Sequence, residues 1–253
     1  MSGTIRAGIL GAAFLFTSAA HAAVMVDLTS AGSKGTINGA IFQQYSPQPT
    51  GTGVLNTFLR VQNDGVEEGY NTDFRKVDLN QTPDPSTRSL LLSEIPKVTI
   101  DDVLYREFLL DINESNNTPI LSLNDVELFL GLNPNAIGYA NLGTPIYKMD
   151  TGGNNSVKLN YSLNSGSGSG DMLMYVPDAN FDATKGPYVT LFSRFGQPIP
   201  GDNSDVTSDA GFEEWSAGKK GPRGGNVPIT VPEPSSLSLL LFGAAALLRR
   251  GRR

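Results

Sequence analysis

Beyond residue 22, this chain lacks the two side chains that most catalytic and metal sites use. The 253 residues include no cysteine and one histidine, His21, which lies in an apolar N-terminal segment. No disulfide can therefore form. A Ser-His-Asp triad, a cysteine nucleophile, a haem site and the usual zinc or copper sites are excluded as well. What remains is carboxylate chemistry, either acid–base pairs or hard cations such as Ca²⁺.

Basic charge is also scarce in the body of the chain. The sequence has 19 basic and 25 acidic residues, but Arg6, four C-terminal arginines and Glu233 lie in the two terminal segments. The part between them keeps 14 basic and 24 acidic residues, a net charge of −10. Such an acidic domain does not suit nucleic acid or an anionic surface. It suits a soluble extracellular protein, with cation binding as a further option.

The long apolar runs lie at the two ends. At the N-terminus, Arg6 precedes the apolar stretch Ala7–Phe16, and Ala20-His21-Ala22 gives an A-x-A cleavage site. This order predicts a signal peptide over residues 1–22, cleaved after Ala22 or Ala23. Export is therefore expected.

The C-terminal segment has three parts in a fixed order. Pro232, Glu233 and Pro234 come first, an apolar run follows over 237–248, and four arginines at 249, 250, 252 and 253 close it. The prolines prevent regular structure across the triplet. Twelve to fourteen apolar residues rise only about 18–21 Å as a helix, short of the roughly 30 Å hydrocarbon core. The arginines hold this end in the cytoplasm.

This order, over residues 231–253, resembles the PEP-CTERM sorting signal of Gram-negative bacteria. The resemblance implies that a membrane protease-transferase, exosortase, recognises Pro232, Glu233 and Pro234 together with the basic cluster at Arg249 and Arg250. It implies transient insertion of the apolar helix into the inner membrane, then delivery to the cell surface or medium, often in bacteria that make exopolysaccharide. A simple membrane anchor is the alternative, and the short helix argues against it.

Between the two ends, short β-type runs alternate with segments rich in Gly, Asn, Ser, Thr and Pro. Alternating or continuous apolar patterns bounded by turn residues predict the strands. They are Val24–Leu28, Ile37–Tyr45, Val54–Gln62, Leu90–Leu92, Val98–Ile100, Val103–Ile112, Leu121–Leu132, Val157–Leu163, Met172–Val176 and Tyr188–Phe195. Gly211–Ser216 is expected to end the ordered part. We expect Leu121–Leu132 to be two half-strands joined by a bulge or turn at Asn124-Asp125, and Glu67–Ser86 to be a long loop.

About ten short strands, with no long amphipathic helix, predict an all-β fold. We expect a single β-sandwich or jelly-roll-like domain over residues 23–217, followed by a flexible spacer over 218–230 that holds the domain off the membrane.

Two stretches could form a site. Asp202, Asp205 and Asp209 lie in an Asx-rich loop that resembles a calcium loop but lacks the EF-hand pattern, so solvated Asx turns are the alternative. Glu213 and Glu214 precede Trp215, the only tryptophan. An indole beside carboxylates can bind a sugar ring, but a lone tryptophan in a β-domain can equally fill the core.

These observations favour a non-enzymatic, exported structural protein of the cell surface or biofilm matrix. The alternative is a carbohydrate-binding module, assisted by calcium, and the weaker alternative is a carboxylate-dependent glycosidase or polysaccharide lyase. The expected partners are exosortase, the general export machinery and extracellular polysaccharide, and no nucleic acid. No cofactor is expected apart from Ca²⁺ at the Asp202 loop.

Overall fold

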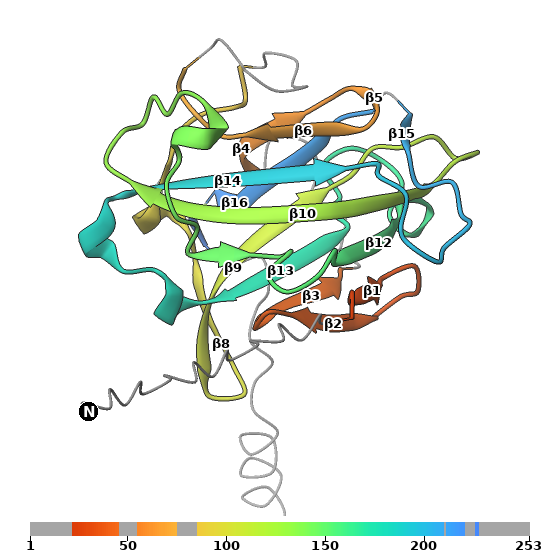
Figure 1. The fold of residues 1–253 in the computed structure, drawn as a ribbon, viewed down its shortest axis with the longest axis horizontal. Coiled ribbons are helices and arrows are strands. Elements are labelled where there is room, and N and C mark those ends of the chain that lie inside the picture. Colours follow the sequence, from red (N-terminus) through yellow and green to blue (C-terminus); the bar gives the residue numbers. More distant parts are fainter. Residues whose placement is uncertain (1–21, 46–54, 75–84, 210, 221–225, 228–253) are drawn as a thin grey trace, which may run out of the picture.

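The computed structural model describes residues 22–45, 55–74, 85–209, 211–220 and 226–227. The expected sorting signal at 231–253, and all but the last residue of the expected signal peptide, lie outside these residues. The described chain folds into two β-sheets packed face to face (Figure 1). Within the described residues, no helix is long and apolar enough to cross a membrane.

One sheet has seven strands. Its main path is β1 (Met25–Asp27), β12 (Ser156–Asn160), β10 (Ile120–Gly131), β14 (Tyr188–Phe195) and β6 (Glu67–Tyr70). The short strands β11 (Tyr147–Lys148) and β7 (Leu90–Leu91) pair with β10 and β14. All pairs are antiparallel except β1 with β12, which is parallel.

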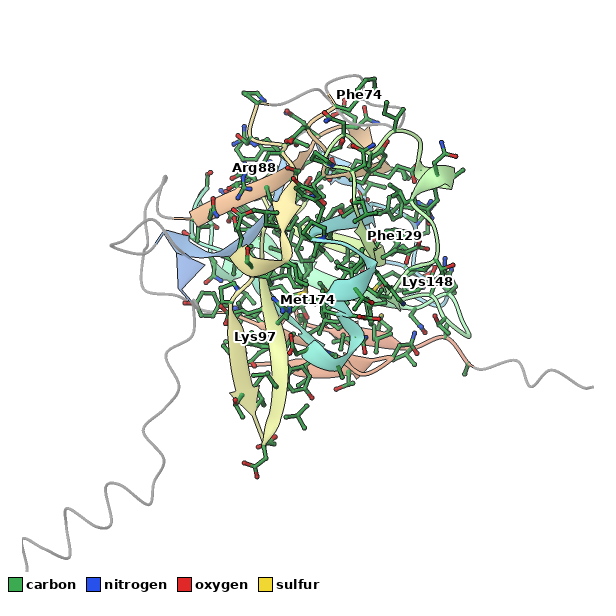
Figure 2. All side chains as sticks on the ribbon, turned by 90° about the vertical axis from the view of Figure 1, so that its left-hand side faces the viewer. Phe74, Arg88, Lys97, Phe129, Lys148 and Met174 are labelled. Carbon is green, nitrogen blue, oxygen red and sulfur yellow. The ribbon has the colours of Figure 1, made fainter. Side chains whose placement is uncertain are left out.

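The other sheet has eight strands. Its main path is β17 (Asn226–Val227), β16 (Glu213–Lys220), β9 (Val103–Asp111), β13 (Met172–Pro177), β3 (Ala40–Gln44) and β2 (Lys34–Ile37). β4 (Leu55–Val61) pairs with β16, and β8 (Lys97–Ile100) pairs with β9 in a hairpin that projects from the body (Figures 1 and 2). A separate small pair, β5 (Asp64–Gly65) with β15 (Ser208–Asp209), lies at one end.

The core fills the space between the sheets. Strand alternation sends every second residue inward, and the inward side chains are mostly large and apolar. Phe42, Phe58, Phe108, Phe195 and Trp215 are each fully buried. Burying one such side chain stabilises the fold by roughly 1.5–3 kcal/mol. The core therefore replaces the disulfides that the chain cannot form.

The outer faces carry smaller apolar clusters. Leu109 and Leu173 alternate with core residues on β9 and β13, so they lie on the outer face of the eight-stranded sheet. Phe129 and Phe192 lie in the same way on the outer face of the seven-stranded sheet, with Tyr139 against them. Short 3₁₀ turns connect the strands: Leu92–Glu94, Tyr139–Asn141, Tyr161–Leu163, Asp178–Asn180 and Ala183–Lys185.

The all-β sandwich is confirmed, but its details differ from the sequence expectation. Most of the extra strands have two to four residues, too few to give a pattern. Ile37–Tyr45 is not one strand, because β2 and β3 turn at Asn38-Gly39, where φ is 49° and 85°; the Asn-Gly pair is itself a hairpin signal. The expected loop Glu67–Ser86 begins with β6.

Two further expectations need adjusting. Leu121–Leu132 forms one twelve-residue strand, β10, whose pairing shifts register between Leu123 and Asp125, near the expected bulge. The expected spacer at 218–230 is partly sheet: β16 continues to Lys220 and pairs with β17.

Candidate functional site

Trp215 lies in the core. Its side chain has no exposed surface, and its Nε1–H donates to the Oγ of Ser193 on the opposite sheet, at 3.1 Å. The indole therefore has no face on which a sugar ring could stack, and it takes the core-filling role that the sequence also allowed. Alternation along β16 separates its neighbours: Glu213 points inward with Trp215, and Glu214 points outward.

Glu214 contributes to a surface groove instead. Arg60 donates from Nε and Nη2 to Oε1 of Glu214, at 2.9 and 2.5 Å, and its guanidinium stacks 4.1 Å above the ring centre of Phe212. The groove encloses about 420 Å³. It is lined by β4, β16, the segment before β7 and the glycine-rich loop over residues 164–170. The lining residues are Leu55, Asn56, Thr57, Arg60, Pro85, Ser86, Arg88, Ser167, Gly168 and Glu214.

Two parts of the groove lining, Arg88 and the glycine-rich loop, are held in place by hydrogen bonds and ion pairs. Arg88 donates to both carboxylate oxygens of Glu94 and to Oδ1 of Asn56. The glycine-rich loop is held by Asp111, whose oxygens accept from the backbone of Gly168 and Gly170 at 2.6 and 3.0 Å. The groove is therefore pre-formed, and its lining is a mixture of hydroxyl, amide and paired ionic groups.

The expected calcium loop is arranged differently from a metal site. Asp202 accepts from Lys158 at 2.6 Å and from Ser204, and these bonds lower its pKa. Asp205 accepts from the backbone and hydroxyl of Thr207, which lower its pKa. Both residues therefore form Asx turns, and Asp202 is also paired with Lys158. In the described part of the chain, no three acidic side chains have an arrangement that could hold a metal ion.

Asp209 instead joins a group that the sequence did not reveal. We call Glu67, Glu114, Asp209 and Glu213 the acid cluster. Glu67 and Glu213 have no exposed surface, and Glu114 is 5% exposed. They come from both sheets: Glu67 begins β6, Glu213 begins β16, Glu114 follows β9 and Asp209 lies on β15.

The side chains of Glu67 and Glu213 are placed to share a hydrogen bond when one of them is protonated, and each also accepts a backbone N–H, from Asn63 at 2.9 Å and from Asn113 at 3.5 Å. Burial raises the pKa of Glu67. Burial, then the carboxyls of Glu67 and Glu114, raise the pKa of Glu213 well above its usual range.

Glu114 and Asp209 form the second pair. Burial, then the hydrogen bond with Asp209, raises the pKa of Glu114 to about 9. Burial would raise the pKa of Asp209, but hydrogen bonds from Glu114, Ser115 and Thr118 lower it to about 2. The backbone N–H of Asp209 also donates to Oε2 of Glu114, at 3.0 Å. Glu114 is therefore the acid and Asp209 the carboxylate.

A second group of buried acids lies on the outer face of the seven-stranded sheet. Glu127 is bonded to Lys148, and Asp125, two residues earlier, has its pKa raised to about 7 by burial and by the charges of Asp150 and Glu127. Figure 2 shows Lys148 well away from Arg88, so this group is separate from the groove. No sequence signal marked Glu67, Glu114 or Asp125, because nothing in their neighbours distinguishes them from surface acids.

The comparisons with known proteins bear on the C-terminal end. Residues 230–253 match the family model of the PEP-CTERM protein-sorting motif. Comparison with curated proteins and with solved structures gives no match. The chain is thus an exported β-sandwich protein with a C-terminal sorting signal. The motif identifies it more narrowly as a substrate of exosortase, processed at the membrane on its way to the surface.

Proposed function

We propose that the delivered domain is a non-enzymatic structural protein of the cell surface or extracellular matrix. The observation that supports this is where the carboxylates lie. The 420 Å³ groove contains one carboxylate, Glu214, and it is already bonded to Arg60. Acid–base catalysis of glycoside cleavage needs two carboxyls that flank the bond to be broken. The acid cluster is buried in the fold, where a polymer has no access.

Localisation and activity together test this proposal. A tagged full-length chain is expected at the surface or in the matrix fraction, in a form shortened at the C-terminus. A chain without residues 231–253 is expected to remain soluble in the periplasm. The purified domain is expected to leave bacterial exopolysaccharides uncut. Turnover that one Asp or Glu substitution abolishes would replace the structural role with an enzymatic one.

A carbohydrate-binding role is the second candidate, and the groove favours it. Its planar Arg and Asn groups and its Ser and Thr hydroxyls are the groups that bind sugar hydroxyls, and its volume is that of a small-ligand site. Glycan-array binding tests it. Ser167→Trp, which fills the groove, is expected to abolish binding, whereas Trp215→Phe, in the core, is expected to keep it. Equal binding by both variants would exclude the groove.

A further inference from the structure

The acid cluster contains half of the buried side-chain polar atoms for which the described structure offers no hydrogen-bond partner. Six buried side-chain atoms lack a partner, and three of them are carboxyl oxygens of the cluster: Oε1 of Glu67, Oε1 of Glu114 and Oε2 of Glu213. A fourth, Oγ of Ser208, belongs to the residue next to Asp209. An unpaired buried carboxylate is costly, so the charge of the cluster must be neutralised.

Among the residues that the structure describes, no basic side chain is recorded as a partner of the three glutamates. The main influences on Glu67, Glu114 and Glu213 are burial, each other, Asp209 and backbone N–H groups. Opposite Glu67 and Glu213 in the sheets lie Phe195 and Val61, which carry no charge.

The charged residues next to the acid cluster do not supply positive charge to it. Asp64 lies opposite Asp209 in the β5–β15 pair, and Asp205 is close enough to Asp209 for their charges to repel. Both residues therefore add negative charge around the cluster. The arginines on the adjoining strands face outward: Arg60 is bonded to Glu214, and Arg194 is bonded to Glu68. Protons or a cation must therefore supply the missing positive charge.

The geometry favours protons. The four carboxyls are arranged as two pairs, and within the described residues no three of them converge as metal ligands would. A carboxylic acid bonded to a carboxylate needs one shared proton, as in other close carboxyl pairs.

We propose that the acid cluster is a proton-dependent latch. One proton shared by Glu67 and Glu213, and a second shared by Glu114 and Asp209, hold this end of the two sheets together, and loss of both protons opens it. The first pair joins β6 of the seven-stranded sheet to β16 of the eight-stranded sheet. The second joins the segment after β9 to β15, which closes the same end.

The sign of the effect follows from the raised pKa values of the two acids. A buried acid whose pKa rises on folding contributes stability that is complete below its ordinary pKa of 4.5 and is lost as the pH rises through its folded value, about 9 for Glu114. The latch is therefore closed in acid and neutral solution and opens in alkaline solution. Asp209 has a lowered pKa and so affects stability in acid: its contribution is lost as the pH falls toward about 2 and the carboxylate is protonated.

Hydrogen exchange and thermal unfolding of the full mature chain test the latch. Between about pH 5 and pH 9 we expect Tm to fall by roughly 5–10 °C. Peptides over residues 62–70, 112–118 and 206–214 should lose exchange protection before those of β10 and β14, after correction for intrinsic rates. The Glu114→Gln/Glu213→Gln variant, whose amides imitate the protonated acids, should keep its protection at pH 9. If the variant loses protection at pH 9 to the same extent as the wild type, the proposal is overturned.

Two controls make the result specific. Asp125→Asn, on the outer face of the seven-stranded sheet and away from the cluster, should change the overall pH slope but not the exchange of the three segments. CaCl₂ and EDTA should leave the wild-type exchange at pH 8 unchanged, and protection that required calcium would overturn a proton latch in favour of a metal site. If the double variant does not fold, the infrared difference spectrum between the wild type and Glu114→Gln decides instead, because it removes the bands of other buried acids with raised pKa values, such as Asp125. A protonated carboxyl band must be present at neutral pH and vanish in alkali, and its absence at neutral pH would refute the proposal.

Discussion

The Nε1–H of Trp215 on one sheet donates to the Oγ of Ser193 on the other, at 3.1 Å, and both side chains are fully buried. Ser193→Ala should destabilise the fold by about 1–3 kcal/mol, because it leaves the indole N–H without an acceptor. Trp215→Phe should cost a similar amount. Their double variant should cost less than the sum, since it removes both partners. Urea unfolding measures all three.

The fluorescence of Trp215 gives an independent check on its position. It is the only tryptophan in the chain, so the emission reports on one site. Blue-shifted emission that acrylamide quenches poorly is expected in the folded protein. Strong quenching would mean that the indole is exposed, and would restore sugar stacking as a role for Trp215.

Gly211 lies two residues before β16 and cannot carry a side chain. A Cβ there would lie 1.3 Å from the backbone carbonyl oxygen of Asn113. Gly211→Ala should therefore cost roughly 3 kcal/mol or more, because backbone rather than a rotatable side chain must move. Gly131→Ala is the matched control: nothing lies within 4 Å of its Cβ position, so a change within about 0.5 kcal/mol is expected. Equal costs would contradict the close approach.

Asp125 should make the protein less stable as the pH rises. Its pKa is raised from 3.8 to about 7, so its contribution is complete below pH 3.8 and is lost as the pH rises through about 7. Asp125→Asn should therefore stabilise the protein at pH 8, by about 1–3 kcal/mol, and change little at pH 4. Thermal unfolding at both values measures this, and a variant that is less stable at pH 8 would disagree.

Asp111 should be needed for the shape of the groove. Asp111→Ala leaves the backbone N–H groups of Gly168 and Gly170 without their acceptor and should cost about 2–4 kcal/mol. Asp111→Asn keeps one acceptor oxygen and should cost less. Exchange of residues 165–171 should rise in the same order. A glycine-rich loop that stays protected in Asp111→Ala would show that other contacts hold it.

The sequence alone predicts the properties that depend on the order of residues and on patterns of apolar and turn residues. The sorting signal is a linear pattern, and the family match begins one residue before the expected range. Tyr188–Phe195 was predicted to the residue because proline and glycine bound a run rich in aromatic and β-branched residues. The strands β5, β11 and β15 have two residues each, which is too short to give an alternating pattern in the sequence. Only their pairing with strands far away in the sequence reveals them.

Only the tertiary structure decided which acids are buried and what they contact. Asp202 and Asp209 have similar neighbours in the sequence, yet one is a solvated turn and the other belongs to the acid cluster. Glu67, Glu114 and Glu213 are far apart along the chain and meet because β6 and β16 begin where β9 ends. The sequence determined delivery and fold class, because these follow from local patterns. The structure decided the sites, because a carboxyl group's environment is set by residues that reach it only through folding.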